Sequence, residues 1–205
     1  MNVLIKLSVL DQSLISSGDT AIEAFQNTTQ LAKEVDKLGY TRFWVSEHHF
    51  AKNLAGSSPE VLISHLATIT NRIRVGSGGV MLPHYSAYKV AENFRVLEAL
   101  FPNRIDMGLG RAPGGTHLAT QALQEYKNTY SDKYPEQLDD LITYVYDLAD
   151  KNFRFPNLFA TSKIETAPEM WLLGSSGGSA HLAAQRGSGY AFAQFINGEG
   201  GTEVL

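Results

Sequence analysis

Short apolar runs alternate with helix-spaced apolar positions along most of this chain. The apolar runs end in polar or glycine residues and predict strands at 3–10, 41–46, 73–82, 104–110, 169–174 and 190–195. Apolar residues three and four apart predict helices at 19–38, 59–69, 86–100 and 134–149, and one that starts in SSGGSAHLAAQRG after strand 169–174. Residues 150–168 follow neither pattern, so we expect a surface loop or small hairpin there.

Local signals support several of these elements. Asp19 or Thr20 is the expected N-cap of the first helix, with Glu23 in its first turn and Gly39 as its stop. Strand 73–82 is expected to be buried on both faces, although its middle is rich in glycine. The core-facing residues expected in helix 86–100 are Tyr88, Ala91, Phe94, Leu97 and Leu100.

Strands that alternate with helices at short loop lengths predict a parallel sheet with crossover helices. Two architectures fit this order, an open doubly wound sheet and a (β/α)8 barrel. The pattern supplies six strands before Leu205, and the last residues, GGTEVL, look like the start of a helix. We therefore expect residues 1–205 to be a single domain that stops within its fold, as a truncated barrel of about six β/α units would.

Composition narrows the class of protein. The 205 residues carry a net charge of -4 without a block of like charge, which argues against a nucleic-acid-binding footprint. The sequence has no cysteine, which excludes disulfides and thiolate metal sites. The opening MNVLIKLSVLDQS is interpreted as a strand, not a signal peptide, and no apolar stretch approaches the roughly 20 residues of a membrane span. We expect a cytoplasmic protein.

Polar residues gather where the predicted strands end. Because the carboxyl ends of parallel strands share one rim, we expect these residues to form a common site. They are Asp11, Gln12 and Ser13; Glu47, His48 and His49; Met81, Pro83 and His84; Gly110, Arg111 and Gly114; and Ser175, Ser176 and Ser179.

Two glycine-rich stretches are candidates for holding an anion. GSSGGSA at 174–180 follows a strand and opens a helix, so its N–H groups and hydroxyls suit a phosphate; the alternative is a plain turn with a serine N-cap. GLGRAPGG at 108–115 fails the dinucleotide fingerprint at Pro113. Arg111 could instead contact phosphate in a bidentate manner, the alternative being a surface ion pair.

The EHH sequence at 47–49 allows three interpretations: metal binding, acid/base or cofactor-positioning chemistry, and hydrogen-bonded structural histidines. Adjacent residues of a strand point to opposite faces, which argues against one ion held by all three. His65, His84, His117 and His181 are expected to be structural. Ser77, Gly78 and Gly79 would make room for a flat ring, or for tight helix packing.

These motifs together resemble those of the bacterial luciferase-like flavin monooxygenases. The stretches that carry the resemblance are SVLDQS at 8–13, RFWVSEHHF at 42–50, IRVGSGGVMLPHYSAYKVAENFRVLEALFPNRIDMGLGRAPGG at 73–115 and WLLGSSGGSAHLAAQRGSGYAFAQF at 171–195. They cover nearly the whole chain. The resemblance implies a (β/α)8 TIM-type barrel with a site for reduced FMN (FMNH2) at the carboxyl ends of its strands.

The resemblance also implies the chemistry and its partners. A separate NAD(P)H-dependent flavin reductase would supply FMNH2, and a flavin 4a-hydroperoxide formed with O2 would oxygenate a small organic substrate. Arg111, Ser176 and Ser179 match the phosphate-binding positions, with Ser175 beside them. His48 matches the catalytic histidine, and Glu47 precedes it as in the family.

Three further expectations follow from the resemblance. The Gly78–Gly79 pair, next to Ser77, matches a non-proline cis peptide beneath the flavin ring. A homodimer is implied, with the helices after the first three strands as its interface. Family members continue well past position 205, so the last two β/α units are expected to be missing here. A non-catalytic flavin-binding protein, or an inactive truncated homologue, is therefore the alternative function.

Overall fold

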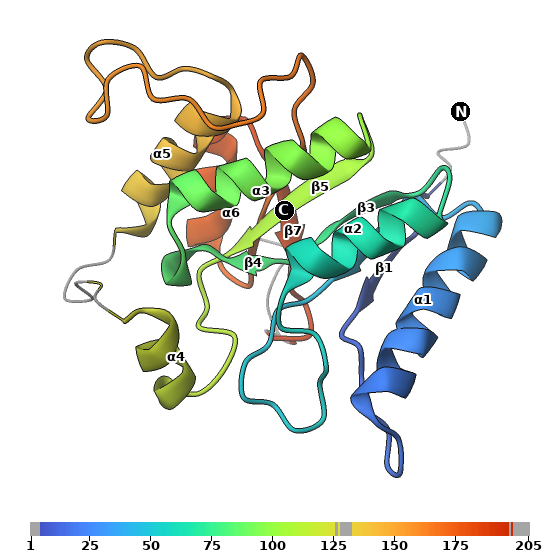
Figure 1. Cartoon of the computed structure of the whole chain (residues 1–205). Coiled ribbons are helices and arrows are strands. Elements are labelled where there is room, and N and C mark those ends of the chain that lie inside the picture. The colour runs from blue at the N-terminus through green and yellow to red at the C-terminus, as the bar shows by residue number, and fades with distance from the viewer. Residues whose placement is uncertain (1–4, 126, 128–132, 197, 199–205) are drawn as a thin grey trace.

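A curled parallel sheet forms the centre of the molecule in the computed structural model, which describes residues 5–125, 127, 133–196 and 198 (Figure 1). Its strands in spatial order are β1 (Ser8–Asp11), β2 (Arg42–Val45), β3 (Arg74–Ser77), β5 (Ile105–Gly110), β6 (Glu169–Gly174) and β7 (Gly189–Phe192), while β4 (Val80–Met81) pairs with β5. Spatial order follows chain order without the reversal of a doubly wound sheet. The sheet is thus half of a barrel, and the TIM-type prediction is confirmed.

Helices return the chain from the end of one strand to the start of the next. They are α1 (Ala21–Lys37), α2 (Pro59–Ile69), α3 (Ala87–Leu100), α4 (His117–Leu123), α5 (Tyr134–Val145) and α6 (Gly177–Arg186), with a 3-10 turn, η1, at Leu82–His84. In Figure 1, α1, α2 and α3 lie along one side of the sheet. Thr20 caps α1 in a reciprocal box with Glu23, as predicted. Each helix in the described part of the chain is too short or too polar to span a membrane.

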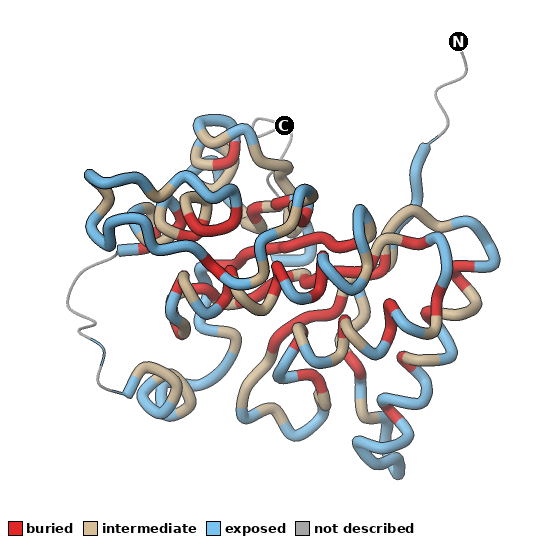
Figure 2. Tube along the Cα trace, turned by 45° about the horizontal axis from the view of Figure 1, so that its top comes forward, coloured by how far each residue is buried: buried red, intermediate tan, exposed pale blue. Residues whose placement is uncertain are grey.

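The hydrophobic core lies between the outer face of the sheet and the helices. Figure 2 shows this as runs of buried backbone along the strands and the facing helix turns. Phe43 and Val75 from the sheet pack in one cluster with Ile63, Leu66 and Phe94 from α2 and α3, and all five are fully buried. Alternate residues of each strand point the other way, into the half-barrel, and these build the site.

Some sequence predictions need correction. The predicted strand 73–82 is broken at Gly78 and Gly79, because the chain turns there before β4 and η1. Leu100 is 59% exposed at the end of α3, since the apolar stripe continues past the last turn that the core covers. The predicted helix 134–149 ends at Val145, and strand 190–195 ends at Phe192. The strand predicted at 3–10 begins only at Ser8, so the described residues 5–7 do not belong to it. The predictions for residues 3–4 and 200–205 lie outside the described residues.

A buried ion network ties the strands together at their amino ends. The Asp106 carboxylate is fully buried and lies 2.6 Å from Arg74 Nε and 3.0 Å from Arg42 Nε. Trp44 Nε1 donates to it at 2.9 Å. Burial raises the pKa of Asp106, whereas these donors and cations oppose the rise. The network fills the inner face at this end of the sheet, so the accessible cavity lies at the carboxyl ends.

Candidate functional site

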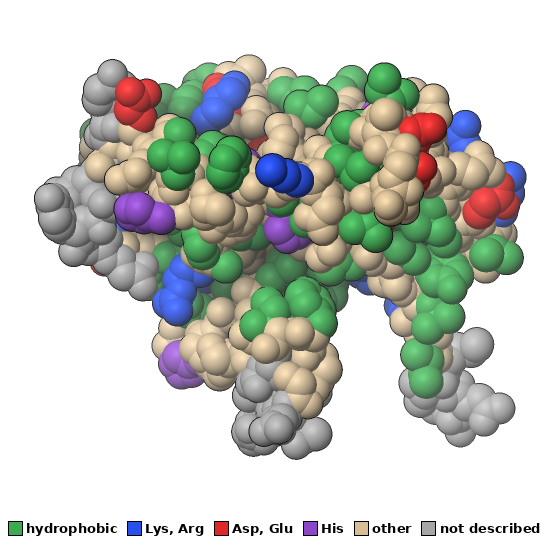
Figure 3. Space-filling view, turned by 90° about the horizontal axis from the view of Figure 1, so that it is seen from below, with side chains coloured by type: hydrophobic (Ala, Val, Ile, Leu, Met, Phe, Trp, Pro, Cys, Tyr) green, Lys and Arg blue, Asp and Glu red, His purple; other side chains and the backbone are tan. Residues whose placement is uncertain are grey.

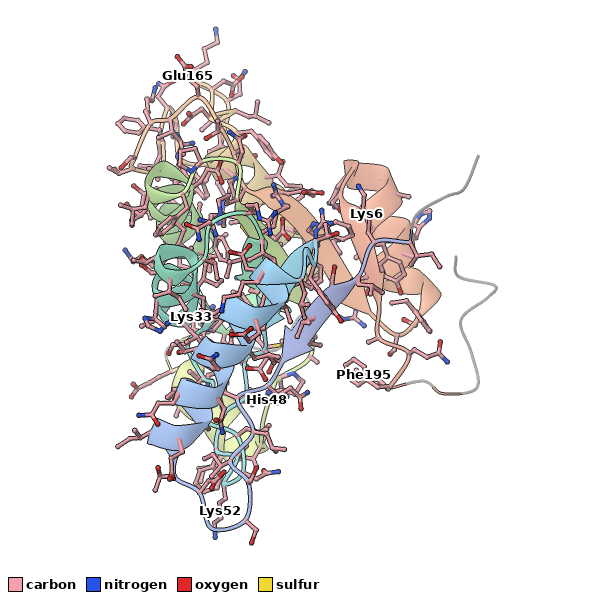
Figure 4. All side chains as sticks on the ribbon, turned by 90° about the vertical axis from the view of Figure 1, so that its right-hand side faces the viewer. Lys6, Lys33, His48, Lys52, Glu165 and Phe195 are labelled. Carbon is pink, nitrogen blue, oxygen red and sulfur yellow. The ribbon has the colours of Figure 1, made fainter. Side chains whose placement is uncertain are left out.

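A cavity of about 340 Å³ lies at the carboxyl ends of the strands. Seen from below, this end of the molecule is hollowed, with hydrophobic side chains beside histidine and basic ones (Figure 3). The cavity brings together residues from segments far apart in sequence, and Figure 4 shows His48 and Phe195 at this same end. The predicted residues that line the cavity are Gln12, Glu47, His48, Gly78, Gly79, Met81, Gly110, Arg111, Gly114, Ser175, Ser176 and Ser179. The predicted residues outside this lining are Asp11, Ser13, His49, Ser77, Pro83 and His84.

Gly78 and Gly79 form one side of the cavity, joined by a cis peptide bond as the resemblance predicted. A Cβ on Gly78 would lie 2.7 Å from Leu10 Cδ1, and one on Gly79 would lie 2.8 Å from the carbonyl oxygen of Gly108. Neither position has room for a side chain. Ser77 lies behind them, fully buried, and its hydroxyl donates to Gly108 O at 2.8 Å. The Ser77 hydroxyl also accepts from the Gly108 N–H at 3.0 Å, so Ser77 supports this floor from behind through its side chain.

The Glu47 carboxylate is fully buried, and hydrogen bonds from several elements hold it in place. It accepts from the Tyr85 hydroxyl at 2.8 Å, from the Met81 N–H at 3.0 Å and from His49 Nε2 at 2.7 Å. Burial raises the pKa of Tyr85, and the Glu47 carboxylate raises it further, so the phenol keeps its proton and donates. These bonds occupy Glu47 in fixing the end of β2. We call residues 46–49 the EHH corner.

His48 is the half-buried histidine of the EHH corner and lies against the cavity. Its Nδ1 lies 3.1 Å from the Ser46 hydroxyl. Burial lowers the pKa of His48, the neighbouring His49 lowers it further, and Glu47 opposes them. The ring is therefore neutral at pH 7, and its Nε2 is the atom that could exchange a proton with a ligand.

The serine turn, residues 174–179, faces the EHH corner from the end of β6. Ser176 is the N-cap of α6, and the first N–H groups of a helix have no partner within it. Ser176 is exposed and Ser179 is half-buried, and both line the cavity with Ser175. A Cβ on Gly174 would lie 2.5 Å from Ser179 Oγ, so glycine is needed for the turn to close. Hydroxyls and helix N–H groups together suit an anion.

Arg111 lies in the segment between β5 and α4 and lines the same cavity. This segment is attached to the EHH corner, because the His49 N–H donates to Gly114 O at 2.8 Å and His49 pairs with Gly115 in an isolated bridge. The predicted convergence of the two anion stretches at one site is thus seen in the geometry. A cationic donor and the serine turn border a single space.

Part of the cavity lining was not predicted from the sequence. Phe195 and Ile196, after β7, are 72% and 65% exposed and line the cavity with Leu173 and Ala193. Their position after the last strand was the sequence signal that could have indicated a place in the cavity lining. Tyr85, which directly follows the predicted strand-end residue His84, was also missed, and so was helix α4, which has no buried residue among those described. Within the described residues, no three His, Asp or Glu side chains lie close enough to hold a metal ion.

Comparison with known proteins gives a consistent family. A family model described as luciferase-like monooxygenase matches residues 5–204. The chain is 65% identical over 198 residues to uncharacterized protein YwcH of Bacillus subtilis (strain 168), covering 97% of this chain. It is 49% identical over 203 residues to the N-acetyl-S-alkylcysteine monooxygenase of the same organism, covering 98% of this chain. The chain spans 60% of the length of both relatives.

Solved structures agree with the fold. The crystal structure of apo-MsnO8 matches with a TM-score of 0.85 and 42% identity, over 94% of this chain and 56% of that one. The oxygenating constituent of 3,6-diketocamphane monooxygenase from Pseudomonas putida, a type II Baeyer-Villiger monooxygenase in complex with FMN, matches with a TM-score of 0.73 over 92% of this chain and 57% of that one. At 18% identity, this second match speaks for the fold alone.

Proposed function

This chain belongs to the luciferase-like monooxygenase family, and from that premise we propose that it carries the flavin site of an FMNH2- and O2-dependent monooxygenase. The observation that carries the proposal is the cavity that Arg111, the serine turn, the Gly78–Gly79 floor and His48 line together. Reduced flavin supplies the two electrons with which O2 is split, one oxygen atom going to the substrate and the other to water.

The chemical types of the residues that line the cavity fit the parts of FMN. Arg111 is a cation, and the serine turn offers N–H and O–H donors. Both suit a terminal phosphate. Gly78 and Gly79 add no side chain to the wall of the cavity, which suits a flat ring. A relative of the same fold is in complex with FMN, which supports the choice of flavin.

We propose separate roles for the two residues first assigned to catalysis. His48, neutral at pH 7 and half-buried, exchanges a proton with the reacting atoms through Nε2. Glu47, which is fully buried and engaged by Tyr85, Met81 and His49, fixes the EHH corner. The apolar side chains after β7, which line the cavity, would pack against a bound ligand and shield it from water.

A thioether is the first substrate class to test, because one relative acts on an N-acetyl-S-alkylcysteine. Since this chain spans 60% of the length of such relatives, we also propose that further β/α units complete the barrel in a longer parent protein. A NAD(P)H-dependent flavin reductase is the proposed partner, and a homodimer is the proposed assembly. The alternative function is flavin binding without catalysis.

The test is a coupled assay with the chain as it is. FMN, NADPH, a flavin reductase and isotopically labelled O2 are supplied with a panel of S-alkylcysteines, their N-acetyl forms and aldehydes, and products are analysed by mass spectrometry. The proposal expects tight binding of FMN and one labelled oxygen atom in one product. Binding without any labelled product would favour the non-catalytic alternative. A folded chain that does not bind FMN would overturn both.

A further inference from the structure

His84, which the sequence reasoning left as a structural residue, has both ring nitrogens engaged. The side chain is 2% exposed at the end of η1. Its Nε2 lies 2.7 Å from the carbonyl oxygen of Pro113, and its Nδ1 lies 3.0 Å from Gln124 Nε2. A carbonyl oxygen only accepts, so Nε2 carries the hydrogen and Nδ1 accepts from the Gln124 amide. Its partners therefore fix the tautomer and the ring plane of His84.

Pro113 belongs to the segment that carries Arg111. On one side, this segment is held by the EHH corner through the bond from the His49 N–H to Gly114 O. On the other side, it is held by the bond from His84 Nε2 to Pro113 O. Arg111 lies two residues before Pro113 and directly after Gly110, which pairs with Met81 at the end of β5. The two attachments beyond Arg111 therefore help to set the path of its backbone after it leaves the sheet. A glycine-rich segment without them would sample many conformations.

We propose that His84 is a positioning residue that acts through Arg111. Its Nε2–H holds the Pro113 carbonyl and so fixes the backbone that presents the guanidinium to the anionic end of a ligand. A pre-ordered guanidinium loses less conformational freedom when it binds phosphate, which raises affinity. The inference rests on the proposed function, because the anion in question is the phosphate of FMN.

A purely structural role predicts different behaviour. The His84 ring also packs edge-on against His49 and Tyr85, with centroids 5.8 and 6.0 Å away. If His84 only filled this space, its loss would lower stability and weaken every ligand to the same degree. If it positions Arg111, its loss weakens only the part of the affinity that depends on the phosphate. FMN and riboflavin differ in that group alone, so their comparison separates the two roles.

The experiment measures dissociation constants of FMN and riboflavin for the wild type, His84→Leu, His84→Gln, Arg111→Ala and the double variant His84→Leu/Arg111→Ala. We expect His84→Leu to weaken FMN binding about fivefold, the size of one neutral hydrogen bond, and riboflavin binding by less than about twofold. His84→Gln, which can still offer an N–H to Pro113 O, restores FMN affinity. In the Arg111→Ala background, His84→Leu causes no further loss.

Circular dichroism and thermal melting identify variants that fail to fold. If His84→Leu fails to fold, Gln124→Leu is the second test. It removes the partner of His84 Nδ1 from a half-buried position and should also weaken FMN binding. Equal weakening of both ligands, or additive losses in the double variant, would overturn the inference. If the wild type prefers FMN over riboflavin and His84→Leu keeps that preference, the role of His84 is overturned and the phosphate site stands. A wild type without any preference overturns the phosphate site as well.

Discussion

The EHH corner and the serine turn border the same cavity but hold their polar groups in opposite ways. In the EHH corner, Glu47 is buried and its carboxylate is surrounded by protein donors. In the serine turn, Ser176 is exposed, and the first N–H groups of α6 point out of the helix end. A carboxylate whose hydrogen bonds are all made within the protein can fix the shape of the corner, whereas a turn whose donors point outward can bind a ligand. We therefore expect mutations in the corner to affect stability most and mutations near the turn to affect ligand affinity most.

The largest expected effect tests the corner. Glu47→Leu leaves the Tyr85 hydroxyl and the Met81 N–H buried without their acceptor, so the free energy of unfolding should fall by roughly 3 kcal/mol. Urea denaturation measures the change. Glu47→Gln keeps the shape and one acceptor oxygen and should lose about 1 kcal/mol. Wild-type stability in Glu47→Leu would contradict the view that this corner is held by its carboxylate.

The second effect concerns affinity at the other side of the cavity. Arg111→Ala should weaken FMN binding by about 1.5–3 kcal/mol, the range of a charged hydrogen bond, with little change in stability because Arg111 is exposed. Titration calorimetry measures the affinity. Arg111→Lys keeps the charge but loses the bidentate geometry, so its affinity should be intermediate. An unchanged dissociation constant in Arg111→Ala would remove this residue from the site.

A smaller effect is expected from the serine turn itself. Ser176→Ala and Ser179→Ala each remove one neutral hydroxyl donor and should weaken FMN binding by about 0.5–1.5 kcal/mol. Ser188→Ala is the matched control, because Ser188 follows the C-cap of α6, at the opposite end of the helix from the serine turn, and its hydroxyl donates to Ala183 O at 3.4 Å. If Ser188→Ala weakened FMN binding as much as Ser176→Ala, the loss would reflect the fold and not the turn.

The smallest expected effect is a pH dependence of stability caused by His48. Burial lowers the pKa of His48 below its ordinary 6.5, so the unfolded chain binds more protons than the folded chain near that pH. Stability should therefore rise with pH through this window and be lost as the pH falls below 6.5. The slope of the urea midpoint against pH, measured around pH 6.5, should be smaller in His48→Gln than in the exposed-histidine control His117→Gln. An unchanged slope in His48→Gln would contradict the shift.

Much of the fold could be predicted from the sequence, because its signals are local. The Thr20 cap, the strand ends and the order of strands and helices follow from short patterns and from the shared rim of parallel strands. The convergence of Arg111, His48 and the serines on one cavity was predictable for the same reason.

Other features depend on contacts between distant residues. The bonds from Tyr85 to Glu47 and from His84 to Pro113 join positions 38 and 29 residues apart, and no spacing in the sequence indicates them. The glycine-rich middle of the predicted strand 73–82 was visible in the sequence, but the apolar residues on both sides of it favoured one continuous strand, so the break at Gly78 was not predicted. Helix α4 has no buried residue among those described, so it offered no apolar stripe to detect.

The Asp106 network has a consequence for ionic strength. Its ions lie inside the half-barrel, with the Asp106 side chain fully buried, so dissolved salt screens them poorly. Arg111 and Ser176, in contrast, are exposed, so salt would strongly screen the contacts proposed for them with an anionic ligand. Added salt should release an anionic ligand well before it disturbs the curvature of the sheet that shapes the cavity.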